Sequence, residues 1–266
     1  MQPKPNGASF AQPSSPGAGG GAGAPVREFA EPVPEHLRSG YQALMAGDAD
    51  TALELWVKLY ERYPSAEVCG HIARVHYYKT FFLGHGPGHP MHAEHIAQMR
   101  LWAERALSLN PNSSIGHALL GAAIGRQALM SGSRRQIVKS TWQVKHHAEQ
   151  AILIDNTWMG HFVLGSWHRE IASVARWMRA IAGLLRARIP VGSYEEALKH
   201  FDEVLKQYPE NNTMYAEIAY TYEKMGDMKR AKENYARALA MPVFRHPIAP
   251  HLTRQAAEHY RKVFGS

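Results

Sequence analysis

The stretch Asn212–Pro242 reads NTMYAEIAYTYEKMGDMKRAKENYARALAMP, and small and aromatic residues recur in it at helical spacing on both sides of a Gly-Asp pair. This spacing predicts two helices joined by a tight turn at the Gly-Asp pair. Small residues allow the two helices to approach closely, and aromatic residues fill the space toward a neighbouring pair. The positions that carry the pattern are Ala219, Tyr222, Gly226, Ala231, Tyr235 and Ala238.

A second copy of this spacing occurs near the other end of the chain. Its positions are Gly40, Ala43, Gly47, Ala52, Trp56 and Leu59, followed by Pro64. Both copies have Gly-Asp at the turn, and their spacing resembles that of the tetratricopeptide repeat. One such unit cannot stay folded alone, because only a neighbouring unit buries its apolar face. The two copies therefore predict that the residues between them also form helix pairs.

Weaker units in the same phase fill the interval between the two copies. Small residues and a proline mark their ends at Ala103, Pro111 and Ala151, and an inserted helix interrupts the fourth unit. The fold class we predict is all-α, a tetratricopeptide-like helical-repeat solenoid of about five helix pairs with an inserted helix and a C-terminal capping helix. The predicted boundaries are 34–64, 65–111, 112–155, 156–209 and 211–242 for the repeats, 171–188 for the inserted helix and 249–264 for the cap.

The segment 1–33 differs from the rest of the chain in composition. It consists mostly of Pro, Gly, Ala and Ser, and such a segment cannot bury enough apolar surface to offset the entropy of ordering. We therefore predict a disordered arm over 1–33 and one folded domain over 34–266. The arm is either a plain linker or a segment that orders along a partner's surface, in which case Phe10 and Phe29 are its anchors.

The charge of the chain narrows the classes of partner. There are 30 Lys and Arg residues against 23 Asp and Glu residues, a formal net charge of +7. This balance favours an acidic protein segment or an anionic lipid or membrane surface as partner. Nucleic acid ranks last, because the basic residues are dispersed and no nucleic-acid motif is present.

Cysteine content and hydropathy bear on the compartment. Cys69 is the single cysteine, so the chain holds no internal disulfide. Neither a signal peptide nor a run of about 18 apolar residues, as a membrane-spanning helix requires, is visible. We therefore expect a cytoplasmic protein, or one that is peripheral to a membrane.

One part of the chain points to a narrower family. The segment His161–Trp167, HFVLGSW, is followed by a tryptophan-containing helix, by Pro190 and by Ser193–Phe201, SYEEALKHF. Over residues 90–245 this order resembles the regulator of microtubule dynamics family, in which an extra helix divides one repeat. The resemblance implies a helical binding domain, and eukaryotic members associate with microtubules, tether organelles and bind lipid. This chain is expected to differ from them in lacking a membrane anchor and in its His-rich second repeat, and its composition looks bacterial.

Histidines cluster in the segment Gly84–His95, where a Gly/Pro loop leads into a helix. His92 and His95 are one turn apart and His89 lies near the helix start, so three imidazoles could converge on Zn²⁺. The alternative is a set of surface hydrogen bonds, which the sequence favours because no cysteine ligand or zinc-enzyme motif accompanies them. We therefore expect no cofactor, and a metal site at His89, His92 and His95 is the lesser hypothesis.

The predicted inserted helix combines apolar residues with basic ones, including Arg176 and Arg179. As an amphipathic basic helix it could place these arginines at an anionic lipid headgroup, beside a groove that takes acyl chains. The preferred interpretation is a helix packed in the concave groove with its apolar stripe in the core. A lipid-binding module is therefore the second functional hypothesis.

No sequence motif with a catalytic mechanism is present, and no catalytic residue is nominated. The leading hypothesis is a non-catalytic scaffold or adaptor that binds an acidic or extended segment of a protein partner through its concave groove. An accessory subunit of a larger membrane-associated complex would be one such protein. The residues expected to face the groove are Arg74, Tyr77, Arg126, Arg169 and Tyr222.

Overall fold

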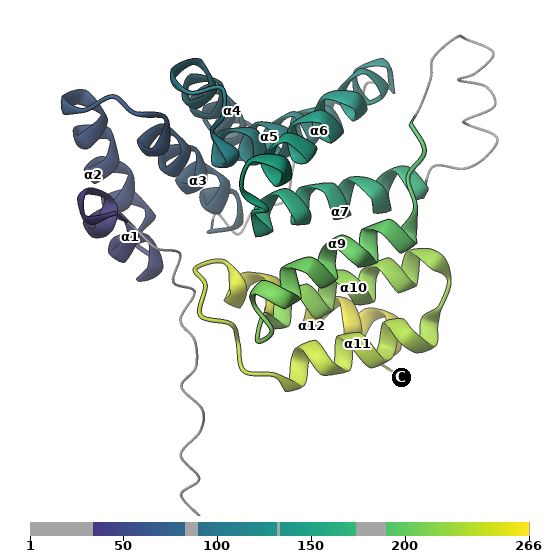
Figure 1. Ribbon diagram of the computed structural model, residues 1–266. Coiled ribbons are helices and arrows are strands. Elements are labelled where there is room, and N and C mark those ends of the chain that lie inside the picture. The colour runs from purple at the N-terminus through teal and green to yellow at the C-terminus, as the bar shows by residue number, and fades with distance from the viewer. Residues whose placement is uncertain (1–33, 83–89, 132–133, 174–189, 266) are drawn as a thin grey trace, which may run out of the picture.

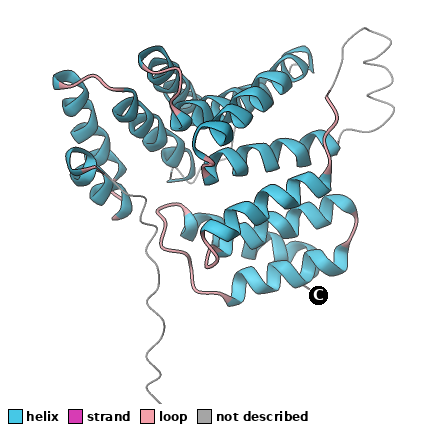
Figure 2. Cartoon of the chain, in the orientation of Figure 1, coloured by secondary structure: helices cyan, strands magenta, loops and turns pink. Residues whose placement is uncertain are grey.

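The computed structural model describes residues 34–82, 90–131, 134–173 and 190–265, and within these ranges the chain is helical with no strand (Figure 2). The helices in chain order are η1 (Glu35–Leu37), α1 (Arg38–Met45), α2 (Ala49–Arg62), α3 (Ala66–Phe82), α4 (Pro90–Leu109), α5 (Ser114–Ser131), α6 (Arg134–Asp155), α7 (Trp158–Ala172), α9 (Tyr194–Gln207), α10 (Asn212–Met225), α11 (Met228–Ala240) and α12 (Ala249–Phe264). The predicted all-α class is confirmed.

Consecutive helices pack as pairs: α1 with α2, α3 with α4, α5 with α6, α7 with α9 and α10 with α11. The first helices of the three middle pairs also contact one another, α3 with α5 and α5 with α7. The last helix, α12, packs on both α10 and α11. Figure 1 shows the chain winding from α1–α3 over α4–α6 and down to α9–α12. The predicted solenoid of paired helices with a terminal capping helix is confirmed.

Several sequence predictions fall on segments that the structure does not describe. The predicted arm, 1–33, lies outside the described residues together with its proposed anchors Phe10 and Phe29. Of the predicted inserted helix, 171–188, only residues 171–173 are described, and the first two of these belong to the last turn of α7. These remain predictions.

The two Gly-Asp pairs form equivalent turns in the first and last repeats. Gly47 and Gly226 adopt φ of 87° and 85°, a left-handed conformation that glycine accepts without strain. Asp48 and Asp227 then cap the following helices, each accepting a 3.0 Å hydrogen bond from the backbone N–H three residues later. The turn that the sequence places at these positions is therefore present in both copies.

The small and aromatic positions of the repeat are core positions. Trp56 is 1% exposed, and a side chain at Gly40 would overlap its indole ring. In the last repeat, Ala219, Ala231 and Ala238 are buried in the same way. Close contact between the two helices of a pair therefore depends on these small residues.

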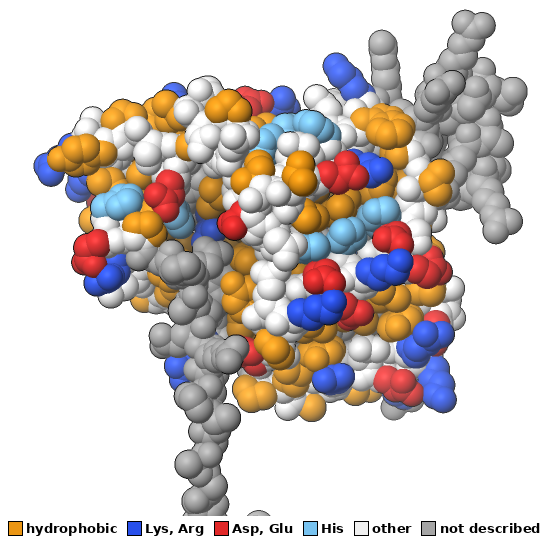
Figure 3. Space-filling model, in the orientation of Figure 1, with side chains coloured by type: hydrophobic (Ala, Val, Ile, Leu, Met, Phe, Trp, Pro, Cys, Tyr) orange, Lys and Arg blue, Asp and Glu red, His pale blue; other side chains and the backbone are white. Residues whose placement is uncertain are grey.

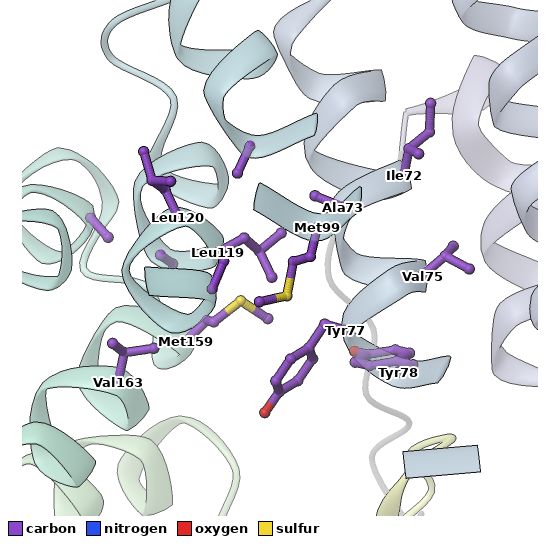
Figure 4. Close-up of a cluster of buried hydrophobic side chains, with 14 of the residues drawn as sticks. Ile72, Ala73, Val75, Tyr77, Tyr78, Met99, Leu119, Leu120, Met159 and Val163 are labelled. Carbon is purple, nitrogen blue, oxygen red and sulfur yellow. The ribbon is translucent and has the colours of Figure 1, made fainter. Parts of the chain in front are cut away.

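The largest apolar cluster runs continuously from η1 to α7. Figure 4 shows side chains of α3, α4, α5 and α7 meeting in it, with Met99, Leu119 and Met159 at the centre and the rings of Tyr77 and Tyr78 at one edge. A continuous core of this kind makes each helix pair dependent on its neighbours for stability.

Candidate functional site

A groove of about 660 Å³ opens on the inner face of the solenoid. Its walls come from the first helices of successive pairs: Tyr77 and Phe81 from α3, Trp158 and Phe162 from α7, and Met214 from α10. Residues of α4, α5, α6 and α12 complete it, and most of the lining is apolar. Such a cavity has the size and apolar character of known ligand sites.

The connection between α11 and α12 forms one wall of the groove. Phe244, His246 and Ile248 are buried and line the groove, whereas Val243 before them and Arg245 between them are exposed. The hydroxyl of Tyr78 lies 2.7 Å from Nε2 of His246, so this connection is fixed to α3.

The other end of the same connection is fixed to α10. The backbone N–H of Phe244 donates to Oδ1 of Asn212 over 3.0 Å. The amide nitrogen of Asn212, which is buried, donates in turn to Oγ1 of Thr253 on α12 at 2.9 Å. The wall is therefore held by hydrogen bonds on two sides, which makes it a fixed part of the groove.

Arg169 is a buried cation that its neighbours neutralise. Its guanidinium lies 2.5 Å from Oε2 of Glu217 and 3.1 Å from Oε1 of Glu170, and it stacks on the rings of Tyr220 and Phe201 at 4.8 and 5.6 Å. Burial alone would lower the pKa of Arg169, but the two carboxylates outweigh this effect and raise it. Arg169 therefore connects α7 to α10 as a structural ion pair.

Arg126 on α5 occupies a different environment in the same groove. Its guanidinium carbon lies 5.0 and 4.9 Å from the ring centres of Tyr77 and Phe81, a cation-π geometry. One guanidinium nitrogen is 3.5 Å from Oγ1 of Thr80, the long limit of a hydrogen bond. Among the described residues no carboxylate forms an ion pair with Arg126.

The residues that the sequence placed in the groove divide into two groups. Tyr77, Arg126 and Arg169 line it. Arg74 is buried and does not line it, and Tyr222 is half-buried with Arg230 stacked 4.9 Å above its ring. Arg176 and Arg179, the predicted headgroup ligands, lie outside the described residues. Trp158, Phe162 and the wall before α12 are groove residues that the sequence analysis did not single out.

The predicted histidine site is partly described. His92 is buried and lines the groove, whereas Nδ1 of His95 lies 3.1 Å from Nδ1 of His76 on α3. His89 lies outside the described residues. Within the described ranges, no group of three or more His, Cys, Asp or Glu side chains is placed to hold a metal ion.

Histidine pairs connect the two helices of three successive repeats, which the sequence analysis did not find. The Nδ1 atoms are 3.1, 2.9 and 2.9 Å apart and the ring centres 5.3, 5.2 and 5.2 Å apart. The pairs are His76–His95, His117–His147 and His161–His200. Figure 3 shows histidine side chains in several groups on the face in view. The pairs therefore form a repeated polar contact within an otherwise apolar interface.

The proton positions in the second pair follow from its neighbours. Nε2 of His117 lies 3.0 Å from the carbonyl oxygen of Pro111, which can only accept, so Nε2 carries the proton. Nδ1 of His117 is then the acceptor, and Nδ1–H of His147 donates to it over 2.9 Å. In the next pair, Nε2 of His161 is held in the same way, 2.8 Å from Oδ1 of Asn156. Protonation of the acceptor nitrogen would break either hydrogen bond.

The environment opposes protonation of all these histidines. Burial, followed by the charge of the partner histidine, lowers the pKa of His76 to about 4 and that of His147 to about 4. Burial is also the largest cause of a lowered pKa at His95, His117, His161 and His200. The pairs are therefore neutral at pH 7.

Stacked helix pairs with a left-handed glycine at the turn and small and aromatic residues in the core are the features of a tetratricopeptide-type repeat protein. The crystal structure of TTC0263, a thermophilic TPR protein of Thermus thermophilus, has the same fold with a TM-score of 0.58 and 18% sequence identity, over 84% of this chain and 96% of that one. The class that the repeat spacing predicts is therefore confirmed.

Within this class, the chain belongs to the family described as Regulator of microtubule dynamics protein 1-3, whose sequence model matches residues 37–260. Regulator of microtubule dynamics protein 1 of Mus musculus is 28% identical over 145 residues, 53% of this chain and 47% of the mouse protein. The Bos taurus protein of the same name is 28% identical over 134 residues, 49% of this chain and 41% of its own length. The matched region thus spans less than half of these relatives. The family resemblance seen in the sequence is confirmed.

Proposed function

We propose that this protein is a non-catalytic scaffold that holds a segment of a protein partner in its inner groove. The observation that carries the proposal is the apolar groove of about 660 Å³ along the first helices of the pairs. Phe81 and Phe162 are only partly buried there, and Leu129 at the groove is 65% exposed. A partner that covers apolar surface of this kind removes it from water, which lowers the free energy of the complex.

The shape of the groove favours a segment over a whole domain. A concave surface built from parallel first helices suits a helical or extended peptide that lies across them. The fixed wall at Phe244 and His246 limits the groove on one side, and the ion pair of Arg169 and Glu217 braces it on another. A preformed site of this kind loses little entropy on binding.

A groove-filling variant tests the proposal. Ser166 lies half-buried on α7 at the groove, so Ser166→Trp places a large ring in it. Ser108 is exposed on α4 and does not line the groove, so Ser108→Trp is the matched control. We expect a protein that co-purifies in stoichiometric amount with the wild type and with Ser108→Trp, and that is lost from Ser166→Trp. A partner retained by both variants would show that the groove is not its site.

Lipid binding is the second candidate, and the meeting of an apolar wall with the cation of Arg126 favours it. An acyl chain with an anionic headgroup has the same two chemical features. The measurement is mass spectrometry of lipids extracted from the purified protein. A stoichiometric phospholipid that Ser166→Trp excludes, in the absence of a protein partner, would favour this candidate over the scaffold.

Association with a membrane, as an accessory subunit or otherwise, stays a prediction. No helix in the described ranges has both the length and the apolar content needed to cross a bilayer. Fractionation of native cells, with the co-purifying proteins identified in each fraction, tests this prediction.

A further inference from the structure

Two arginines line the groove, and they differ in whether a carboxylate of the protein pairs with them. Arg169 has Glu217 and Glu170 within 3.1 Å, so the protein itself supplies its counter-charges. Arg126 lies over two aromatic rings and 3.5 Å from Oγ1 of Thr80, and it forms no ion pair with a carboxylate of the described residues. The charge of Arg169 is therefore paired within the protein, whereas the charge of Arg126 is not paired with a carboxylate of the described residues.

The position of Arg126 makes this difference informative. It is half-buried at an apolar groove, where a cation loses part of its hydration. Its guanidinium carbon lies over the rings of Tyr77 and Phe81, which are nearly perpendicular to each other and contact it from two directions. Aromatic rings accept no conventional hydrogen bond, so the planar set of N–H donors can still bind a planar anion. Two parallel hydrogen bonds to a carboxylate are the contact that these donors fit best.

We propose that Arg126 determines the specificity of the groove by pairing with an aspartate or glutamate side chain of the partner segment, whose neighbouring apolar side chains lie against Tyr77, Phe81 and Phe162. This rests on the proposed function and adds the chemistry of the partner, an acidic apolar peptide. The stacked rings hold the guanidinium in place, so little of its freedom is lost on binding. A basic residue at the same place would be repelled by Arg126.

Arg105 provides a matched control from the same protein. Its guanidinium carbon lies 5.6 and 4.6 Å from the ring centres of Tyr60 and Trp102, so it is stacked in the same way as Arg126. Arg105 is exposed and does not line the groove. A change at Arg105 therefore removes a stacked surface cation without changing the groove.

The experiment is selection of random dodecapeptides, displayed on phage, against the full-length wild type, Arg126→Glu and Arg105→Glu. Peptides enriched on the wild type and on Arg105→Glu should share an acidic residue flanked by aromatic or aliphatic ones. Those enriched on Arg126→Glu should carry Lys or Arg at that place. A synthetic copy of a peptide enriched on the wild-type protein is then titrated by calorimetry. Its affinity for Arg126→Glu should be at least about 30-fold lower than for the wild type, and its affinity for Arg105→Glu should equal that for the wild type.

A second variant and the circular dichroism spectrum guard against misfolding. Arg126→Gln removes the charge without reversing it and should also weaken the peptide, while Arg126→Lys should weaken it less. Each variant should show the helical spectrum and thermal midpoint of the wild type. If Arg126→Glu does not fold, the Arg126→Gln and Arg126→Lys titrations decide the question.

Three outcomes would overturn the inference. In the first, the enriched peptides lack an acidic residue, fail to bind Ser166→Trp and bind Arg126→Gln as well as the wild type. The groove would then be a peptide site in which Arg126 has no role. Failure to enrich any peptide would overturn the inference and the proposed function together. The third outcome is that no peptide is enriched, while vesicles of phosphatidylcholine with phosphatidic acid bind the wild type and not Arg126→Glu. The anion that pairs with Arg126 would then be a lipid phosphate, and both the inference and the scaffold proposal would be overturned.

Discussion

The hydroxyl oxygen of Tyr78 lies 2.7 Å from Nε2 of His246, although 168 residues separate the two in the chain. The two rings meet edge to face with their centres 5.0 Å apart, and Trp158 packs on His246 at 6.0 Å. This contact connects the second helix pair to the segment before the capping helix. The groove therefore depends on a hydrogen bond between its second helix pair and the C-terminal part of the solenoid.

Tyr78→Phe tests that dependence. The ring stays in place, since Tyr78 is 1% exposed, but the hydrogen bond between its hydroxyl and Nε2 of His246 is lost. We expect the free energy of unfolding in urea to fall by about 1–3 kcal/mol. Tyr63→Phe removes the same atom from a side chain that is 69% exposed and should change little. Equal effects of the two substitutions would mean that the contact adds no stability.

The histidine pairs predict a fall in stability at mildly acidic pH. Burial holds the pKa of His76 and of His147 at about 4, against 6.5 for the free side chain. Between these values the unfolded chain binds protons that the folded chain does not. Stability is therefore complete above pH 6.5 and decreases as the pH falls toward 4, by up to about 1.4 kcal/mol per pH unit for each such histidine.

Urea unfolding at pH 7, 5.5 and 4.5 measures this decrease. His147→Gln removes one of the titrating groups and should make the decrease between pH 7 and 4.5 smaller than in the wild type. His36→Gln is the control, because this side chain is 53% exposed and its contact with Glu67 lies at the surface. A wild type equally stable at pH 7 and 4.5 would contradict the assignment of neutral pairs.

The ion pair between Arg169 and Glu217 predicts a non-additive pair of substitutions. Arg169→Met leaves the carboxylate of Glu217, whose side chain is 24% exposed, without its counter-charge and should cost about 3 kcal/mol of stability. Glu217→Met removes one of the two counter-charges of Arg169 and leaves only the carboxylate of Glu170. The double variant should be more stable than the sum of the two single effects implies, which a double-mutant cycle in urea measures. Strict additivity would mean that the two charges do not interact.

The fold could be predicted from the sequence because its determinants are local. The small residue at Gly40 and the ring of Trp56 belong to one helix pair, and the turn at Gly226 follows directly from a Gly-Asp pair. Their spacing repeats along the chain, so one copy supports the next. This is why the helix pairs and the family could be inferred without any structure.

The groove could be predicted only in part, since it depends on how successive pairs curve. Spacing along α3 and α5 placed Tyr77 and Arg126 on the inner face, but nothing local indicates that His246 returns to Tyr78. The histidine pairs were missed because their members are 19, 30 and 39 residues apart. One signal was visible: Gly-His recurs at the same place in α5 and α7, with His117 and His161 as its histidines.

Two glycines on neighbouring helices should respond to alanine in opposite directions. A Cβ at Gly165 would lie 2.8 Å from Cε1 of Phe201 and 3.2 Å from a backbone oxygen of α9, and Phe201 is fully buried, so Gly165→Ala should cost about 1–3 kcal/mol. At Gly125 the nearest atom, on Val144, is 3.5 Å away, so Gly125→Ala should stabilise α5 by up to about 1 kcal/mol because alanine favours helix. A urea midpoint that does not fall for Gly165→Ala would refute the close packing of α7 on α9.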